Sequence, residues 1–160
     1  MARTFGYEGG YGWTGENPIK LRNMLIKAND AFTKLRKTLK FDAIAFSGSS
    51  GAAIAFPLAV SHKIPVIYVR KANEQSHGNM VECNGENPIK NYLIVDDFIS
   101  SGDTVAWIAN QIKSYARGAP KPKLVGVLCF TEDSQRAYKR NFGSGIGEIQ
   151  IYTPEFILKK

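Results

Sequence analysis

Apolar residues recur along residues 21–39 at spacings of three and four, which is the pattern of a helix with one buried stripe. Asn17 and Pro18 come directly before this stripe. Asn followed by Pro is a typical helix start, because the Asn side chain can cap free amides and Pro has no amide that needs a partner. The pattern predicts a helix that begins at Asn17-Pro18 and ends near Leu39. Its stripe consists of Leu21, Met24, Leu25, Ala28, Ala31, Phe32, Leu35 and Leu39.

Short apolar runs rich in β-branched residues alternate with helical stretches in the rest of the chain. They predict strands over 41–46, 65–69, 92–95, 124–130 and 147–152, with helices over 52–62 and 104–115. We expect a tight turn over 47–51 and a long polar loop over 72–87. This order predicts an α/β fold, a mainly parallel sheet with helices on both faces. The loops that begin at Ser47, Arg70 and Asp96 should then meet at one edge of the sheet.

The composition is that of a globular protein with an excess of cations. The chain has 160 residues, 44% of them hydrophobic and 22% charged, and a formal net charge of +7. This charge is compatible with an anionic partner, either nucleic acid or a small phosphorylated ligand, or with solubility alone. Several of the cations gather near the end of the first predicted helix, where they also complement the helix dipole, so a nucleic-acid partner is not favoured. They are Lys34, Arg36, Lys37 and Lys40.

The sequence lacks the features of cysteine-based scaffolds and of membrane or secreted proteins. Cys83 and Cys129 are the only cysteines and form no metal-ligand motif, so neither a disulfide scaffold nor a zinc site is indicated. No apolar run reaches membrane-spanning length, and residues 1–13 lack the apolar core of a signal peptide. We therefore expect a cytoplasmic protein without a membrane partner.

Residues 93–104 carry the most informative chemical pattern. An apolar strand ends in Asp96 and Asp97, and a loop of small hydroxyl residues then leads into a helix. Such a loop offers amide and hydroxyl donors to a phosphate group, whereas the two acids would repel it unless they bind sugar hydroxyls or hydrated Mg²⁺. A sugar phosphate satisfies both parts, although each part alone is also common in ordinary turns. The loop consists of Ser100, Ser101, Gly102, Asp103 and Thr104.

In this order the acids and the hydroxyl loop resemble the phosphoribosyl pyrophosphate (PRPP) signature of type I phosphoribosyltransferases. Two other strand ends extend the resemblance. Arg70 and Lys71 resemble the family's basic pair, and the preceding loop, made of Gly48, Ser49, Ser50 and Gly51, resembles its pyrophosphate loop. His77-Gly78 resembles the flexible loop of orotate phosphoribosyltransferases. That branch usually carries a Lys between the basic pair and the His-Gly, and this chain has none there, which does not favour orotate as the acceptor.

The resemblance implies a single phosphoribosyltransferase-like domain over 1–160, with a core over about 41–131 and a small hood from 1–16 and 132–160. It implies an enzyme that transfers phosphoribose from PRPP to a nitrogenous base and releases pyrophosphate. Asp96 and Asp97 would be catalytic and would hold Mg²⁺, and the other residues of the three loops, including His77, would bind substrate. A homodimer is compatible with this reading. The hood selects the base, so the base stays open.

The alternative on the same fold is a protein that binds a nucleotide or a phosphoribosyl ligand without turning it over. Such a protein would act as a sensor, a regulator or a sequestering protein. The small hood and the missing loop Lys motivate this second hypothesis.

Overall fold

The computed structural model describes residues 18–72, 74, 78–83, 87–116, 120–131, 136–143 and 145–159. These residues form one seven-stranded sheet with the strand order β3-β2-β1-β4-β5-β7-β6. Strands β2, β1, β4, β5 and β7 run parallel to one another, and the two edge strands, β3 and β6, are antiparallel to their neighbours. The strands are β1 (Ala43–Phe46), β2 (Val66–Val69), β3 (Val81–Cys83), β4 (Asn91–Asp96), β5 (Lys123–Cys129), β6 (Tyr138–Asn141) and β7 (Glu148–Tyr152).

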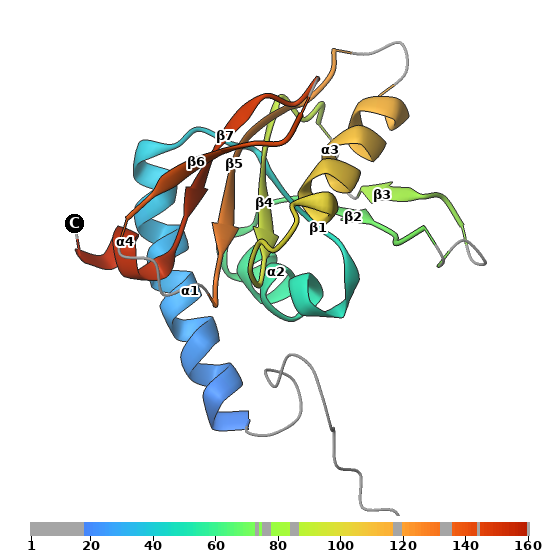
Figure 1. The fold of residues 1–160 in the computed structure, drawn as a ribbon. Helices are drawn as coiled ribbons and strands as arrows, with labels where there is room; N and C mark the ends of the chain where they lie inside the picture. The colour runs from blue at the N-terminus through green and yellow to red at the C-terminus, as the bar shows by residue number, and fades with distance from the viewer. Residues whose placement is uncertain are drawn as a thin grey trace, which may run out of the picture.

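Helices cover both faces of this sheet (Figure 1). They are α1 (Pro18–Thr38), α2 (Gly48–His62), α3 (Asp103–Tyr115) and α4 (Pro154–Lys159). Buried residues of α1, α2 and α4 share one hydrophobic cluster with one face of the sheet, and α3 packs in a second cluster on the other face. The predicted α/β architecture with helices on both faces is confirmed. No helix within the described ranges has the length and apolarity needed to cross a membrane.

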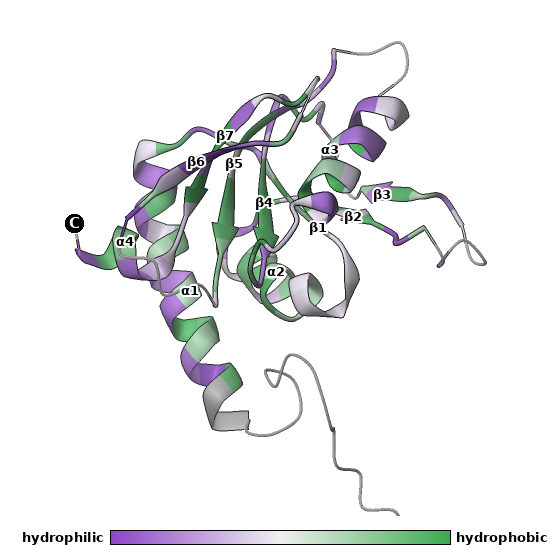
Figure 2. Ribbon diagram, viewed as in Figure 1, coloured by the Kyte–Doolittle hydropathy of each residue, from purple (hydrophilic) through white to green (hydrophobic). Residues whose placement is uncertain are grey.

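The central strands are buried on both faces, which explains their continuous apolar sequences. In β1, Ile44 and Phe46 belong to the cluster with α1 and α2, whereas Ala43 and Ala45 face α3. Figure 2 shows these strands in green, and it shows purple polar residues along α1 and α3. The predicted helix over 17–39 is also confirmed, because α1 buries the middle of its apolar stripe against the sheet.

The predicted tight turn over 47–51 is wrong, because α2 already begins at Gly48. Only Ser47 remains outside the helix, as an N-cap residue with extended backbone. A Cβ atom on Gly51 would lie 2.9 Å from the Cβ of Phe46, so this glycine lets the first turn of the helix approach β1. Gly and Ser are typical of turns in general, and here tertiary packing overrides that preference.

The remaining differences concern the edges of the sheet. Within the predicted loop over 72–87, Val81–Cys83 forms β3 and pairs with β2. The sequence also gave no signal for β6 or α4. Strand β6 has the polar sequence YKRN and an exposed or half-buried pattern throughout, so it lacks the alternation that marks a strand with one buried face.

Candidate functional site

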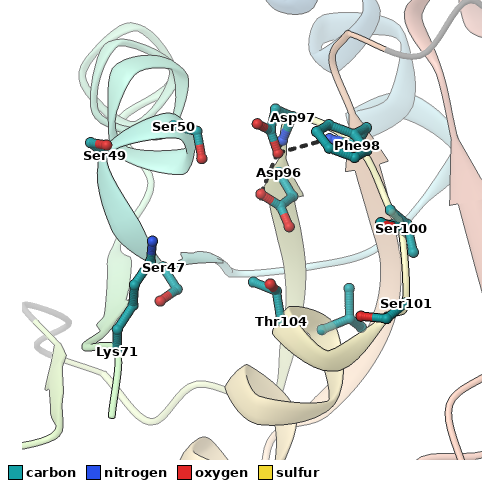
Figure 3. A pocket seen from close by; sticks show the side chains of 13 residues that line it. Ser47, Ser49, Ser50, Lys71, Asp96, Asp97, Phe98, Ser100, Ser101 and Thr104 are labelled. Atoms are coloured by element: carbon teal, nitrogen blue, oxygen red, sulfur yellow. Dashed lines mark hydrogen bonds between the residues drawn. The ribbon is translucent and has the colours of Figure 1, made fainter. Parts of the chain in front are cut away.

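A cavity of about 550 Å³ opens at the carboxyl ends of β1, β2 and β4. Parallel strands end at the same edge of a sheet, and this brings together the three loops that the sequence singled out. Figure 3 shows the two acids between the start of α2 on one side and the loop before α3 on the other. The cavity is lined by Ser47, Ser49, Ser50, Lys71, Asp96, Asp97, Phe98, Ile99, Ser100, Ser101, Gly102, Thr104 and Val105.

Asp96 and Asp97 are both buried, with 6% and 9% of their surface exposed. The amide of Asp97 donates to Oδ1 of Asp96 at 3.0 Å, and the amide of Phe98 donates to Oδ1 of Asp97 at 2.9 Å. Burial and the neighbouring charge of Asp97 raise the pKa of Asp96 to about 7, while Lys71 acts in the opposite direction. Asp96 is therefore partly protonated at neutral pH, which reduces its repulsion of an anionic ligand.

The loop over 100–102 is held from outside the cavity by β6. The guanidinium of Arg140 donates to the carbonyl oxygens of Ser100 at 2.8 Å and Ser101 at 2.6 Å. Gly102 has a φ of +93°, and a Cβ atom on it would lie 3.0 Å from Cε1 of Phe142. Because Arg140 and Phe142 hold the outer side of this loop, its inner side and the start of α3 face the cavity.

Two helices begin at this cavity, α2 after Ser47 and α3 after Gly102, and neither N-cap residue makes a side-chain cap. At the start of α3, the amide of Asp103 donates to Oγ of Ser101 at 3.2 Å. The amino end of a helix carries partial positive charge and free amides, so it attracts anions. The Ser47 hydroxyl is buried and makes no hydrogen bond to another described residue. Buried hydroxyls are normally paired, so this one indicates a contact with a ligand or water. The cavity thus has anion-binding groups on two opposite sides.

The basic pair divides between two environments. Lys71 lines the cavity, and its stem occupies the space beside Gly48, where a Cβ atom would lie 2.7 Å from Cε of Lys71. Arg70 does not line the cavity and instead forms an ion pair with Glu82 of β3. Trp107 of α3 donates to the carbonyl oxygen of Arg70 at 2.8 Å, which fixes the end of β2. Lys71 is the one Lys or Arg among the described residues that line this cavity.

The structure brings most of the predicted site residues into one place and leaves others at its margin. Gly51 packs against Phe46, Gly48 makes room for Lys71, and the Asp103 carboxylate accepts a hydrogen bond from Ser101 at 2.8 Å. His77 lies outside the described residues. The predicted residues that line the cavity are Ser49, Ser50, Lys71, Asp96, Asp97, Ser100, Ser101, Gly102 and Thr104.

Sequence reasoning did not select the apolar wall, formed by Phe98, Ile99 and Val105, or Arg140 behind the loop. The first two lie between the acids and the hydroxyl loop, so their position in the motif was a usable signal. Arg140 carries no such signal, because it reaches the loop from a distant and polar edge strand.

The acids fit a hard cation such as Mg²⁺. They supply two carboxylates, and the described residues contain no group of three or more His, Cys, Asp or Glu side chains that could hold a metal alone. A cation here would take its other ligands from a bound substrate and from water, which is the usual situation for Mg²⁺.

No family model matches the chain. Adenine phosphoribosyltransferase from Ureaplasma parvum serovar 3 is 32% identical over 111 residues, an alignment that covers 60% of this chain. The chain spans 64% of the length of that relative.

Solved phosphoribosyltransferase structures have the same fold. One adenine phosphoribosyltransferase has a TM-score of 0.55 at 18% identity and covers 86% of this chain and 81% of its own. Adenine phosphoribosyltransferase from Saccharomyces cerevisiae has a TM-score of 0.53 at 21% identity, and the match covers 70% of this chain and 68% of the yeast chain. Orotate phosphoribosyltransferase from Aeropyrum pernix has a TM-score of 0.52 at 19% identity, and the match covers 70% of this chain and 59% of the Aeropyrum chain. The chain therefore has the fold of solved phosphoribosyltransferases, and over 111 residues it shares sequence with an adenine phosphoribosyltransferase.

Proposed function

We propose that the protein transfers phosphoribose from PRPP to a nitrogenous base and releases pyrophosphate. The observation that carries this proposal is the single cavity with anion-binding groups on two sides of a buried carboxylate pair. PRPP has phosphate groups at both ends and hydroxyls between them, so its chemistry matches that arrangement. The chain spans only part of its curated relative, and its activity therefore needs a direct test.

Each group of residues has a role in this proposal. The loop over 100–104 and the start of α3 bind the 5′-phosphate through amides and hydroxyls. Asp96 and Asp97 accept hydrogen bonds from the ribose hydroxyls. Lys71 and the amides at the start of α2 bind the pyrophosphate group.

The reaction replaces one bond at the anomeric carbon. A ring nitrogen of the base attacks this carbon and gives up its proton to water, and the bond to the pyrophosphate oxygen breaks with its electron pair leaving on pyrophosphate. Positive charge develops on the ribose ring, and the neighbouring carboxylates stabilise it. Mg²⁺ bound with PRPP would neutralise part of the leaving group's charge. The protein thus contributes orientation and fixed charges rather than a covalent nucleophile.

We assign adenine as the acceptor in this proposal. The curated relative with 32% identity is an adenine phosphoribosyltransferase. Phe98 and Ile99 give the cavity an apolar wall, which suits a flat base. Orotate is the second candidate acceptor, because solved orotate enzymes share the fold.

A pyrophosphate-release assay with PRPP and Mg²⁺ over a panel of bases tests this function. The panel contains adenine, hypoxanthine, guanine, orotate and uracil, and the nucleotide product is identified by chromatography. We expect turnover with adenine. Turnover with another base would correct the acceptor alone, whereas no release with any base would contradict the transferase.

One observation favours the alternative of a nucleotide-binding protein without turnover. Arg70 is paired with Glu82, which leaves Lys71 as the one cation among the described lining residues. This is little positive charge for a departing pyrophosphate. Calorimetry with PRPP and with AMP separates the two functions, because tight binding of either without release on any base would support the alternative.

A cytoplasmic homodimer is the remaining part of the proposal. Neither cysteine forms a disulfide with a described residue, which fits a reducing compartment. Helix α2 exposes two large apolar side chains, with Phe56 51% and Val60 79% exposed, and large exposed apolar residues are typical of contact surfaces.

A further inference from the structure

A second cavity, of about 660 Å³, lies at the opposite end of the sheet, where β4, β5 and β7 begin. We call it the basic cavity, because four lysines line it. Lys113 comes from the end of α3, Lys121 and Lys123 from the start of β5, and Lys139 from β6. None of these side chains belongs to the site described above.

The charge of the basic cavity is strongly unbalanced. Glu148 is the one acidic residue among its described lining residues, and it forms an ion pair with Lys139 at 3.1 Å. Lys113, Lys121 and Lys123 have no ion-pair partner among the described residues. A cleft lined by one sign of charge concentrates ligands of the opposite sign, so the basic cavity should attract anions.

The inner surface of the basic cavity is mainly apolar. Tyr92, Ala109, Leu124 and Ile149 line it and belong to the hydrophobic core on the α3 face. Tyr92, of which 2% is exposed, adds a hydroxyl group to this apolar surface. An apolar surface with one polar group, surrounded by cations, fits a flat ring that carries a phosphate.

We propose that the basic cavity binds a free mononucleotide, with its phosphate on the lysines and its base on the apolar surface. The volume suits one such ligand, since small-molecule sites measure about 300 to 1,000 Å³. A free nucleotide is favoured over a nucleic-acid strand because the lysines surround one cavity that has its own apolar surface.

The two cavities are separate but share elements. Strand β4 runs from Tyr92 at the basic cavity to Asp96 at the first site, and α3 likewise joins Thr104 to Lys113. A ligand in one cavity leaves the other open. Binding at the basic cavity can therefore be measured residue by residue, without using turnover as the readout.

Titration of ¹⁵N-labelled protein with AMP, followed by NMR, tests the proposal. We expect saturable shifts of the amides of Lys121, Lys123 and Gly145, whatever happens at the amides of residues 100–104. Inorganic phosphate and adenosine, titrated separately, should each bind about tenfold more weakly or worse, because each makes only part of the contacts. Shifts confined to residues 100–104 would overturn the proposal.

A variant with Lys121→Gln and Lys123→Gln should weaken the binding at the basic cavity about tenfold and leave the shifts at residues 100–104 unchanged. The matched control, Arg22→Gln with Lys37→Gln, removes the same charge from exposed positions on α1 and should bind AMP normally. Equal losses in both variants would overturn a specific site. If a single-stranded oligonucleotide shifts the same amides and binds more tightly than AMP, the ligand of the basic cavity is nucleic acid and the proposed mononucleotide is wrong.

Discussion

At the scale of single residues, two carboxyl groups are buried next to each other, and this changes the titration of Asp96. They lie side by side with less than a tenth of their surface exposed, and burial raises the pKa of Asp96 to about 7. In the unfolded chain the same carboxyl group would have the ordinary aspartate pKa of about 3.8. The folded protein thus holds a proton that the unfolded chain gives up, and folding stability becomes linked to pH.

This linkage predicts a loss of stability with rising pH in metal-free solution. Because the folded state binds the Asp96 proton more tightly, the free energy of unfolding should fall between about pH 4 and about pH 7, by up to roughly 4 kcal/mol. The Asp96→Asn variant should lose this part of the pH dependence and be more stable than the parent protein at pH 8. Urea denaturation with EDTA at several pH values measures both effects. Asp30→Asn, on the exposed side of α1, is the control and should keep the parent's pH profile.

The same two acids are the residues on which the proposed chemistry depends. Asp96→Asn combined with Asp97→Asn should lower pyrophosphate release at least about a hundredfold, because it removes the charge that stabilises the ribose cation. The double variant should remain folded by circular dichroism, since Asn keeps the size of the side chain. Full pyrophosphate release by the folded double variant would refute the assigned roles.

At the scale of elements, the site depends on how closely helices approach the sheet and how loops are held. Gly51 illustrates the first point, because a Cβ atom there would lie 2.9 Å from Cβ of Phe46 and 3.2 Å from the carbonyl oxygen of Val95. Helix α2 forms one wall of the cavity, so the distance between α2 and strands β1 and β4 determines the position of that wall.

Gly51→Ala should therefore lower the free energy of unfolding by about 1 to 3 kcal/mol, as overpacking does in other cores. The sign of the change in the free energy of unfolding is diagnostic. In a helix with open space at this position, Gly→Ala would stabilise the protein by about 1 kcal/mol through helix propensity. Thermal denaturation measures the difference. Ser49→Ala, on the exposed side of the same turn, should change stability by no more than about 0.5 kcal/mol.

Arg140 illustrates the second point, since it holds the loop over 100–102 by two carbonyl oxygens. Arg140→Ala should weaken PRPP binding about tenfold and speed hydrogen exchange at the amides of residues 100–104, even without ligand. Added guanidinium should restore part of the binding. Lys37→Ala, which removes a cation from an exposed position on α1, is the control. Unchanged exchange in Arg140→Ala would show that the loop keeps its shape unaided.

Local patterns in the sequence were enough to predict the central elements and most of the site. The helix stripe over 21–39, the buried strands and the acid-hydroxyl motif are each contiguous, so their physical causes lie within a few residues of one another. The start of α2, the edge strands and Arg140 depend on contacts between distant segments. The polar sequence of β6 in particular forms a strand only because β7 offers it hydrogen-bonding partners.

At the scale of the whole molecule, the two ends of the sheet differ in chemistry. The carboxyl ends of the strands carry buried acids and two helix starts, and the opposite end carries the lysines of the basic cavity. Helix α2 adds the exposed apolar side chains of Phe56 and Val60.

This apolar surface leads to a prediction about assembly. Val60→Glu should convert the proposed homodimer into monomers, because Val60 is 79% exposed on α2 and a buried charge would oppose association. Sedimentation equilibrium measures the mass. Tyr115→Glu, at another exposed large side chain on α3, should leave the assembly unchanged. A parent protein that is already monomeric at high concentration would exclude the homodimer.

The position of the Lys71 side chain depends on the absence of a side chain at Gly48. The stem of Lys71 occupies the space that any side chain at position 48 would need, and the φ of +70° at Gly48 also disfavours other residues. Any substitution at position 48 would displace the ammonium group of Lys71 from its present place in the cavity wall. In the proposed function, affinity for pyrophosphate would therefore depend on the absence of a side chain at position 48, although residue 48 itself carries no charge.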